Sequence, residues 1–403
     1  MVDLQSLIDR EMDRAGLPVF SLDDVARRRD RKRRNQQVGS AVLALIIAVA
    51  AIGGLFAAFR KPESSLYQNH PLVSKHALSV TEYPVPSTYG PQTIAAGSQR
   101  GAWFVLPNDD AIGRVTRAGS VVTIPLPGAF QEPLGITQGA GGSAWFTESG
   151  GSSGCGPNPR ICPTTEGVGR IDALGVIKEF PLPPNSGPYG IATSPDGNLW
   201  FTETGRIARI TPSGTVTTIP VQLHNDPLNI VAGPDGALWF TEDGMVNGGS
   251  GAIGRMTTSG TLTEYVLPTQ AGHRSGAGDI AVGSDGNLWF TWVTSEVGPA
   301  AASIGRITPS GTITRFPVSE DNGWPAGGIT AGLDGSLWFT LGSANMIGRI
   351  LTTGTVTLFR LPAGSSFPSD IARGSHGFIW FSEAEPSAIG RFQVRGSSPA
   401  LKR

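Results

Sequence analysis

The sequence has little charge, few cysteines and no excess of either sign. Charged residues make up 16% of the 403 residues, and 31 Lys and Arg nearly balance 32 Asp and Glu, for a net charge of −1. This balance gives no electrostatic reason for the main domain to bind nucleic acid. Two cysteines are too few for a four-ligand zinc site. Glycine (55) and proline (31) are abundant, which indicates an all-β chain rich in tight turns.

Charge is concentrated near the N-terminus. Residues 27–34 hold seven basic residues in eight positions, and residues 38–59 hold no charged side chain over 22 positions. Twenty-two helical residues span about 33 Å, enough to cross a hydrocarbon core of about 30 Å. The positive-inside rule then places residues 1–37, expected to be short amphipathic helices and a basic run, in the cytoplasm. The rest of the chain would be extracytoplasmic, on the outer side of the cell membrane.

Two alternatives to this single-pass anchor stay open. The apolar segment could belong to a cleavable signal peptide, although it is longer than the usual apolar region and follows 37 residues. The basic run is expected to contact anionic lipid, with a cytoplasmic partner or nucleic acid as the less favoured interpretation. We expect residues 60–77 to form a tether without regular structure and residues 396–403 to form a tail.

A Trp-Phe pair followed by an Ile-Gly-Arg triplet, or a close variant, recurs seven times in the remaining sequence. Successive Trp residues lie between 39 positions (Trp200 to Trp239) and 55 positions (Trp145 to Trp200) apart, a period typical of propeller blades. The seven triplets end at Arg114, Arg170, Arg209, Arg255, Arg306, Arg349 and Arg391. We expect these arginines to join blades rather than to form an anion site.

Each repeat fits four strands, called A to D, with Gly-bearing turns between A and B and between C and D. The last unit ends after its strand C, whereas residues 79–86 have the pattern of a strand D and precede the first strand A. We therefore predict an all-β, seven-bladed β-propeller over residues 78–395. The N-terminal strand closes the ring and removes its exposed sheet edges.

The two ends of the blades differ in loop length. The B–C connections are long at 149–167, 243–252 and 292–303, and the D–A connections at 221–227 and 268–278. Repeat scaffolds usually carry function where insertions are tolerated. We therefore expect function at this end, called the B–C/D–A face.

Strand B ends in Glu in four of the units, at the mouth of that face. Carboxylates around one opening suit Mg²⁺ or another divalent cation, or a cationic ligand. The alternative is that each Glu caps loop amides or pairs with an Arg of its own blade, so the pattern establishes no cofactor. The candidate metal ligands are Glu148, Glu203, Glu242, Glu383 and Glu385.

Residues that break the repeat are sharper candidates for ligand binding. Polar and charged side chains lie in two D–A loops, and two Trp residues outside the repeat fall on the same face. Exposed aromatic rings beside polar groups favour a sugar or peptide ligand, with packing inside the long loops as the alternative. The candidates are His224, Asp226, His273, Arg274, Trp292 and Trp324.

The two cysteines, Cys155 and Cys162, lie in a Gly/Pro/Ser-rich stretch of one long loop. Outside the cytoplasm a local disulfide is the simpler account, and a free pair of thiols is the alternative.

Three segments resemble the virginiamycin B lyase family: Pro188-Tyr189-Gly190-Ile191, Trp200-Phe201-Thr202-Glu203 and Ile304-Gly305-Arg306-Ile307-Thr308-Pro309. The resemblance covers about residues 79–394. It implies a seven-bladed propeller that opens cyclic type B streptogramins by metal-assisted elimination at an ester. It also implies a His after the Pro that opens the sixth and seventh blades, and a Glu ahead of the last of these prolines. Carboxylates would hold magnesium.

This sequence departs from the implied set. The sixth blade opens with Trp324-Pro325-Ala326, without His, and in the seventh Ser369 replaces the His. Phe367 stands where the metal-binding Glu is implied, which leaves Glu383 or Glu385 as the second carboxylate. A serine hydroxyl cannot replace imidazole, whose pKa is about 6.5, as a base at neutral pH.

The leading hypothesis is therefore a membrane-anchored, extracytoplasmic propeller that binds a small molecule, peptide or glycan on its B–C/D–A face, without being an enzyme. The alternative is a divergent metal-dependent C–O lyase that uses His224, His273 and some of the glutamates. A lactonase is less favoured because no convergent Glu/Asn/Asp set is found.

Overall fold

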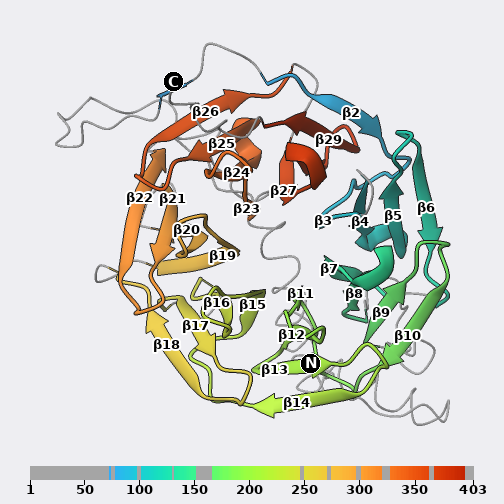
Figure 1. Ribbon diagram of the computed structural model, residues 1–403, viewed down its shortest axis with the longest axis horizontal. Coiled ribbons are helices and arrows are strands. Elements are labelled where there is room, and N and C mark those ends of the chain that lie inside the picture. The colour runs from blue at the N-terminus through green and yellow to red at the C-terminus, as the bar shows by residue number, and fades with distance from the viewer. Residues whose placement is uncertain are drawn as a thin grey trace, which may run out of the picture. The chain divides into compact units, whose positions relative to one another are not determined.

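The computed structural model describes residues 72–73, 78–97, 101–128, 131–150, 166–245, 249–269, 274–295, 301–319, 327–362 and 367–394. Their strands form seven sheets, six of four strands and one of five. The sheets stand as blades around a common axis, as Figure 1 shows. The predicted seven-bladed all-β propeller is confirmed.

Blades 1 to 7 follow one another along the chain, and each has its strand A innermost and its strand D outermost. The strands of blades 1 to 3 are β3 (Ile94–Ala96), β4 (Ala102–Leu106), β5 (Ala111–Val115), β6 (Val121–Pro125); β7 (Pro133–Gln138), β8 (Ala144–Glu148), β9 (Gly167–Ile171), β10 (Ile177–Pro181); β11 (Ile191–Thr193), β12 (Leu199–Glu203), β13 (Arg206–Ile210), β14 (Val216–Pro220).

Blades 4 to 7 continue the same order. Their strands are β15 (Pro227–Ala232), β16 (Leu238–Glu242), β17 (Ala252–Met256), β18 (Leu262–Val266); β19 (Arg274–Val282), β20 (Leu288–Ser295), β21 (Ala301–Ile307), β22 (Ile313–Ser319); β23 (Ile329–Ala331), β24 (Leu337–Leu341), β25 (Met346–Ile350), β26 (Val356–Arg360); β27 (Pro368–Arg373), β28 (Phe378–Glu383) and β29 (Ala388–Gln393).

The closure of the ring is as predicted. β2 (Thr81–Pro84) pairs antiparallel with β29, with Thr81 opposite Arg391, and so supplies the outer strand of blade 7. The inner strand of each blade contacts that of the next, and β27 contacts β3. The segment expected to be an unstructured tether also contributes: β1 (Leu72–Val73) pairs in parallel with β26 and makes blade 6 five-stranded.

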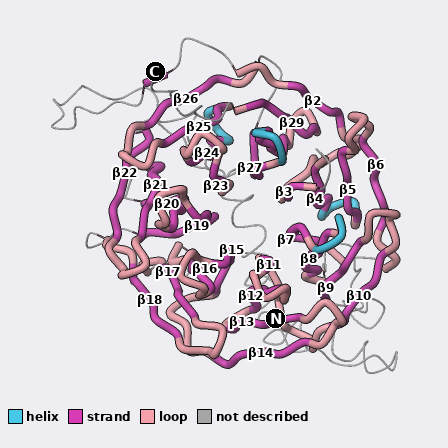
Figure 2. The backbone as a smooth tube through the Cα atoms, viewed as in Figure 1, coloured by secondary structure: helices cyan, strands magenta, loops and turns pink. Residues whose placement is uncertain are grey.

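Helical structure is sparse in the described part of the chain, where it consists of short 3-10 turns, drawn cyan in Figure 2. They are η2 (Pro107–Asp109), η3 (Ala140–Gly142), η4 (Gly342–Ala344) and η5 (Ser375–Gly377). Within those described residues, no helix has the length and apolar character needed to span a bilayer. The predicted cytoplasmic helices (1–37) and membrane span (38–59) lie outside the described residues.

The repeat motif builds the packing inside each blade. The Phe of each Trp-Phe pair lies across from the Gly of the Ile-Gly-Arg triplet, as Phe104 lies opposite Gly113. A Cβ added at Gly113 would collide with the Phe104 ring, and the same holds in five other blades. Blade 3 has Ala208 at this position, opposite Phe201. Glycine therefore recurs because a buried aromatic ring needs its space.

The Trp and Arg of each unit stack on one another. The Arg guanidinium carbon lies 5.0 to 5.8 Å from the centroid of its own blade's Trp ring in all seven blades, a cation–π distance. Arg114 also donates to the Ala173 carbonyl of blade 2, and Arg306 to the Thr352 carbonyl of blade 6. The expectation that these arginines join blades is supported by both contacts.

A chain of hydroxyl groups connects neighbouring blades near the axis. The Thr or Ser after each Trp-Phe pair donates to a carbonyl in the inner strand segment of the next blade, over 2.5 to 3.5 Å. Six blades carry such a hydroxyl: Thr147, Thr202, Thr241, Thr291, Thr340 and Ser382. Blade 1 has Val105 at this position. We call each contact between adjacent blades a seam, so the blade 1/2 seam lacks this hydrogen bond.

Candidate functional site

The mouth glutamates end strand B in blades 2, 3, 4 and 7. Glu148, Glu203, Glu242 and Glu383 are each at most 2% exposed. Because side chains alternate along a strand and the preceding Thr or Ser contacts the next blade, each of these Glu residues faces the previous blade. Each carboxyl therefore lies in a seam, beneath the D–A loop that enters its own blade.

Glu148 lies among other acids at the blade 1/2 seam. Burial, together with the charges of Glu179 and Asp110, raises the pKa of its carboxyl to about 8. Burial also raises the pKa of Glu132, which a hydrogen bond from Ser149 opposes. Asp110 Oδ1 accepts the backbone N–H groups of Gln131 and Glu132 at 2.9 and 3.0 Å. Asp110 therefore fixes the D–A loop across this seam.

The next two glutamates have partners within their own seams. Glu203 lies 3.6 Å from the Nε of Arg206 in the same blade. Glu242 Oε2 accepts the backbone N–H of Asn225 at 2.9 Å, and Glu264 Oε1 accepts that of His224 at 2.7 Å. Burial, opposed by the Asn225 hydrogen bond and assisted by the charge of the neighbouring Glu264, raises the pKa of Glu242 to about 8. These contacts are the loop capping and ion pairing that were the alternative to a metal site.

The candidate metal ligands occupy separate seams. Across the residues that the structure describes, no group of three or more His, Cys, Asp or Glu side chains could hold a metal ion. Glu383 is buried in blade 7, and Glu385 is exposed on the loop that follows. The five glutamates therefore do not form one ring of ligands around the opening of the channel.

Blades 4 and 5 hold the described candidates for ligand binding. His224 and Arg274 are exposed and Asp226 is half-buried. Arg274 begins β19 and donates to the Met245 carbonyl across the blade 4/5 seam at 3.1 Å. Isolated bridges from Asp243 to Gly276 and from Ser250 to Ser275 join the same two blades. These links anchor the surface that carries the three side chains.

Blade 5 extends further than the other blades, and this changes the setting of Trp292. Part of the expected loop 292–303 is strand instead, because β20 continues to Ser295 and β21 begins at Ala301. Trp292 is 1% exposed and packs near Phe290, with the Arg315 guanidinium 5.5 Å from its ring centroid. The expectation of an exposed Trp292 ring is wrong, because the ring belongs to a buried apolar cluster that includes Ile253 and Leu267 of blade 4.

Four of the predicted site residues lie outside the described residues. His273 and Trp324 lie in the undescribed parts of two D–A connections, and Cys155 and Cys162 lie in the undescribed part of the B–C loop of blade 2. Their roles stay predictions.

The inner wall of the ring holds groups that sequence reasoning missed. Asp279 Oδ2 accepts the Ile329 N–H at 2.8 Å, and Asp370 Oδ2 accepts the Ile94 N–H at 2.9 Å, each from the next blade. Burial raises the pKa of Asp279 well above its ordinary value, and the charge of Asp370 adds to this. Burial raises that of Asp370 to about 6, opposed by the N–H groups of Ile94 and Ile371.

The charges of both aspartates act on the Tyr189 hydroxyl. Burial raises its pKa to about 12, and the charges of Asp370, Asp243 and Asp279 add to the effect. A sequence signal existed: the residue before the inner-strand Ile is Gly in blades 2, 3 and 6 and Asp in blades 5 and 7. A Cβ at Gly135 would collide with the Tyr189 carbonyl, so an acid at this position marks a different seam.

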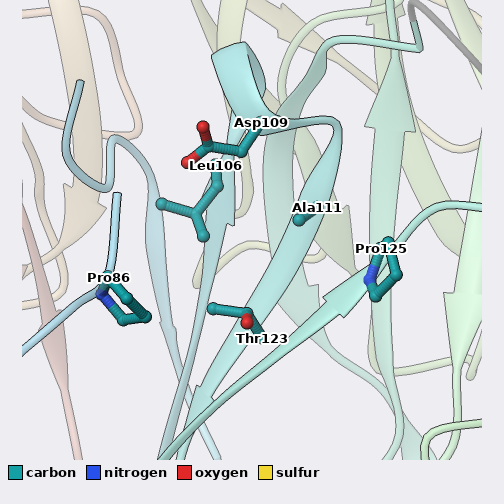
Figure 3. A pocket seen from close by; sticks show the side chains of 6 residues that line it. All are labelled: Pro86, Leu106, Asp109, Ala111, Thr123 and Pro125. Atoms are coloured by element: carbon teal, nitrogen blue, oxygen red, sulfur yellow. The ribbon is translucent and has the colours of Figure 1, made fainter. Parts of the chain in front are cut away.

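A shallow pocket of about 260 Å³ lies on blade 1, away from the predicted candidates. Figure 3 shows Asp109 on its 3-10 turn beside Leu106, with Pro86 and Pro125 on either side. Ala111 and Thr123 complete the lining. Its few polar groups offer little chemistry.

The entry to blade 7 corresponds to the position where the family resemblance implies reactive groups. Phe367 has a left-handed φ of 52°, and its carbonyl accepts the Ala384 N–H at 3.2 Å. Pro368 lies opposite Glu383 in the sheet register. The Ser369 hydroxyl donates to the Phe367 carbonyl at 3.4 Å, and the Ser369 carbonyl accepts from Thr340. This backbone holds an aromatic ring and a hydroxyl beside one buried carboxyl.

Comparison with known proteins agrees with this architecture. The sequence profile of the Virginiamycin B lyase family matches residues 73–154, 162–299 and 205–400. The chain belongs to the virginiamycin B lyase family. A virginiamycin B lyase of Nocardia farcinica is 30% identical over 238 residues, which are 59% of this chain and 72% of that protein.

Solved structures of virginiamycin B lyases share the fold. A catalytically inactive virginiamycin B lyase from Staphylococcus aureus, crystallised with quinupristin, is 33% identical with a TM-score of 0.66, covering 79% of this chain and 100% of that chain. A streptogramin B lyase structure is 31% identical with a TM-score of 0.65, covering 79% and 98%. The hydrazine synthase of Kuenenia stuttgartiensis, 14% identical with a TM-score of 0.62, covers 78% and 98% and shares the fold alone.

Proposed function

We propose that this chain is a membrane-anchored, extracytoplasmic propeller that binds a ligand on its B–C/D–A face and does not carry out the streptogramin elimination of its relatives. The observation that carries the proposal is the entry to blade 7. There Phe367 and Ser369 stand where the resemblance implies a metal-binding Glu and a His. Neither an aryl ring nor a hydroxyl with an ordinary pKa removes a proton at neutral pH.

The implied magnesium does not fit the residues present. The Phe367 side chain offers no ligand atom, its carbonyl already accepts the Ala384 N–H, and Glu385 is exposed on its loop. Glu383 alone remains beside Pro368, and one carboxylate is a poor match for the oxygen set that a hard cation requires. No step of a reaction is therefore assigned to a metal at this entry.

The binding surface that we favour is formed by blades 4 and 5. His224, Asp226 and Arg274 are the accessible charged or polar candidates there, and backbone bridges hold the two blades together. A rigid surface with a few convergent polar groups is typical of ligand sites. A small molecule, a peptide or a glycan are the ligand classes that such a surface would take.

A ligand panel tests the binding proposal with the full-length protein in detergent. Quinupristin, a muropeptide and a chito-oligosaccharide serve as the small-molecule, peptide and glycan probes, measured by isothermal titration calorimetry. We expect at least one to bind without being cleaved, and Arg274→Ala or Asp226→Asn to weaken it at least tenfold. Asp196→Asn, on an A–B turn of the opposite face, is the matched control. Binding that is equal in all variants would exclude this surface.

The second candidate is a divergent C–O lyase. It is favoured by blade 4, where Glu242 lies beside the loop of the exposed His224. Burial raises the pKa of Glu242 to about 8, so its carboxyl is protonated at neutral pH. An acid and a base in one place could serve an elimination at an ester. Mass spectrometry of quinupristin after incubation would show a linear product. Ring opening that is lost in His224→Ala would establish the lyase and overturn the non-enzymatic proposal.

Membrane anchoring has a separate test. The full chain should sediment with membranes and resist a carbonate wash, and removal of residues 38–59 should release it. Protease added to intact cells should digest the propeller but spare residues 1–37. Recovery of the full chain in the soluble fraction would contradict the anchor.

A further inference from the structure

The blade 1/2 seam differs from the other six in how it is held near the axis. Each of the other seams has a hydroxyl that donates to the next blade, and Thr147 to the Tyr189 carbonyl is one example. Val105 is buried at the equivalent position of blade 1 and has no hydroxyl to donate. The carbonyl at the equivalent position of blade 2 belongs to Leu134. This seam is therefore held by its apolar core, by Asp110 and by the hydrogen bond from Arg114 to the Ala173 carbonyl.

Acidic groups gather in the same seam at its end on the B–C/D–A face. Asp110 from blade 1 holds the backbone of Gln131 and Glu132. Glu148 from blade 2 is 2% exposed, and its Oε1 has no hydrogen-bond partner. A charged carboxylate buried without donors and beside another acid is costly. The closed seam thus favours the neutral form of Glu148.

Among the described residues packed around Glu148, no cation pairs with its carboxyl. β7 has no titratable residue, the described part of the D–A loop carries Glu132, and β10 carries Glu179. Blade 1 carries Asp109, Asp110 and Arg114, and the Arg114 guanidinium lies over Trp103 and donates to the Ala173 carbonyl. Strand alternation places Arg170 of β9 and Lys178 of β10 on the opposite face of the sheet. There Arg170 lies over Trp145, and Lys178 lies over Phe180. The charges that act on Glu148 are those of Glu179 and Asp110.

We infer that the blade 1/2 seam is a proton-controlled latch, closed while Glu148 is neutral and loosened on the B–C/D–A face when Glu148 ionises. Ionisation places a second negative charge beside Asp110, which holds the D–A loop. The loop and the adjoining ends of β7 and β8 then separate from blade 1 to hydrate the carboxylate. The apolar cluster of Trp103, Phe146 and Ile171 lies deeper in the seam and keeps the ring closed.

The direction of the pH response follows from the two states of the carboxyl. In the closed seam the pKa of Glu148 is about 8, against an ordinary value of 4.5, which a hydrated, open seam would restore. The closed form therefore binds more protons throughout this window. Opening becomes easier as the pH rises from about 5 to about 8, by at most about tenfold per pH unit for one proton, and then levels off.

Amide hydrogen exchange on the full-length protein measures this opening. Protection factors, which remove the pH dependence of intrinsic exchange, are compared for β7 and for β24 of blade 6 between pH 5 and pH 8. Leu341 takes the place of Glu148 in blade 6, so β24 is the internal control. We expect protection of β7 to fall by up to about tenfold per pH unit, while that of β24 stays constant.

Two variants decide whether Glu148 is the cause. Glu148→Gln should abolish the slope and keep β7 protected up to pH 8. Val105→Thr, which supplies the missing donor, should raise β7 protection roughly fivefold at every pH, the contribution of one hydrogen bond. If Glu148→Gln fails to fold, Asp110→Asn replaces it and should move the slope to lower pH. A flat profile in the wild type, or a slope that survives in Glu148→Gln or does not move in Asp110→Asn, would overturn the latch.

Discussion

The blade 1/2 and blade 6/7 seams share a backbone design but carry different side chains. In blade 1 the 3-10 turn η2 ends at Asp110 with a φ of 45°, and in blade 6 η4 ends at Asn345 with a φ of 52°. The carbonyl of each accepts an N–H from the start of the following D–A loop, that of Leu126 or Leu361. Two positions that are distant in the sequence thus present their loops in the same way.

The next blade continues the correspondence and then departs from it. Glu132 and Phe367 both have left-handed φ values, of 47° and 52°, and each precedes a Pro that lies opposite a buried Glu. At the blade 1/2 seam this position is an acid beside further acids, whereas at the blade 6/7 seam it is an aromatic ring. The propeller scaffold therefore specifies where a side chain is presented and leaves its chemistry free to change.

Loss of a core ring should affect both seams equally, because the scaffold is shared. Phe146→Ala in the blade 1/2 seam and Phe381→Ala in the blade 6/7 seam each remove a fully buried ring and should each cost about 3–5 kcal/mol of unfolding free energy. Urea unfolding followed by tryptophan fluorescence measures both. A difference larger than about 2 kcal/mol would contradict the equivalence of the two seams.

Truncation of the turn-ending residues should separate the seams. At pH 5, Asp110→Ala leaves two backbone N–H groups without their acceptor and should cost about 1.5–3 kcal/mol more than the shared strain of alanine at positive φ. Asn345→Ala should cost less, because its Oδ1 accepts no hydrogen bond from the described residues. Thermal unfolding of the two variants side by side checks this order, and equal losses would contradict it.

A carboxyl in a third seam provides a pH comparison. The pKa of Glu242 is about 8 against an ordinary 4.5, so the folded state holds a proton that the unfolded chain releases. The free energy of unfolding should therefore fall as pH rises from about 5 to about 8, by at most about 1.4 kcal/mol per pH unit for this group. Glu242→Gln should reduce the slope measured by urea unfolding. Glu203→Gln, whose carboxyl is ion-paired with Arg206, is the matched control and should reduce it less.

The smallest expected effect concerns the hydroxyl of the blade 6/7 seam. Thr340→Val removes the donor to the Ser369 carbonyl and makes this position resemble Val105 of blade 1. The expected loss is about 0.5–1.5 kcal/mol of unfolding free energy. Thr340→Ser keeps the hydroxyl and should lose less in the same calorimetric scan. An unchanged stability in Thr340→Val would show that this hydrogen bond does not strengthen the seam.

The fold could be predicted because the repeat records it directly. Counting strands was enough to assign residues 79–86 to blade 7, because the last unit lacks a strand D and a closed ring needs one in every blade. The pairing of β2 with β29 confirms this. The positions of the mouth glutamates also followed from the register of strand B. The capping of Asn225 by Glu242 and the pairing of Glu203 with Arg206 match the alternative drawn from the sequence. The acids around Glu148 did not follow from the sequence pattern, because Asp110 comes from the preceding blade.

The site was harder to predict because local sequence does not reveal burial between blades. Trp292 breaks the repeat and was expected to be exposed, yet its ring is buried in a cluster that includes Ile253 and Leu267 of blade 4. Asp279 and Asp370 take the place of a glycine, and the repeat pattern did not indicate that they accept backbone N–H groups of the next blade. In both cases the missing information was the distance between two sheets.

The N-terminal closing strand also has a consequence for biosynthesis. Thr81 pairs with Arg391, so β2 leaves the ribosome 310 residues before its partner (391 − 81). At roughly 5–20 residues per second, that edge waits on the order of 15–60 s for its partner. Its sequence, Thr-Glu-Tyr-Pro, contains a charge and a proline, two features that discourage an edge strand from pairing with the wrong neighbour. The strand that completes the ring is thus suited to remaining single until the last blade exists.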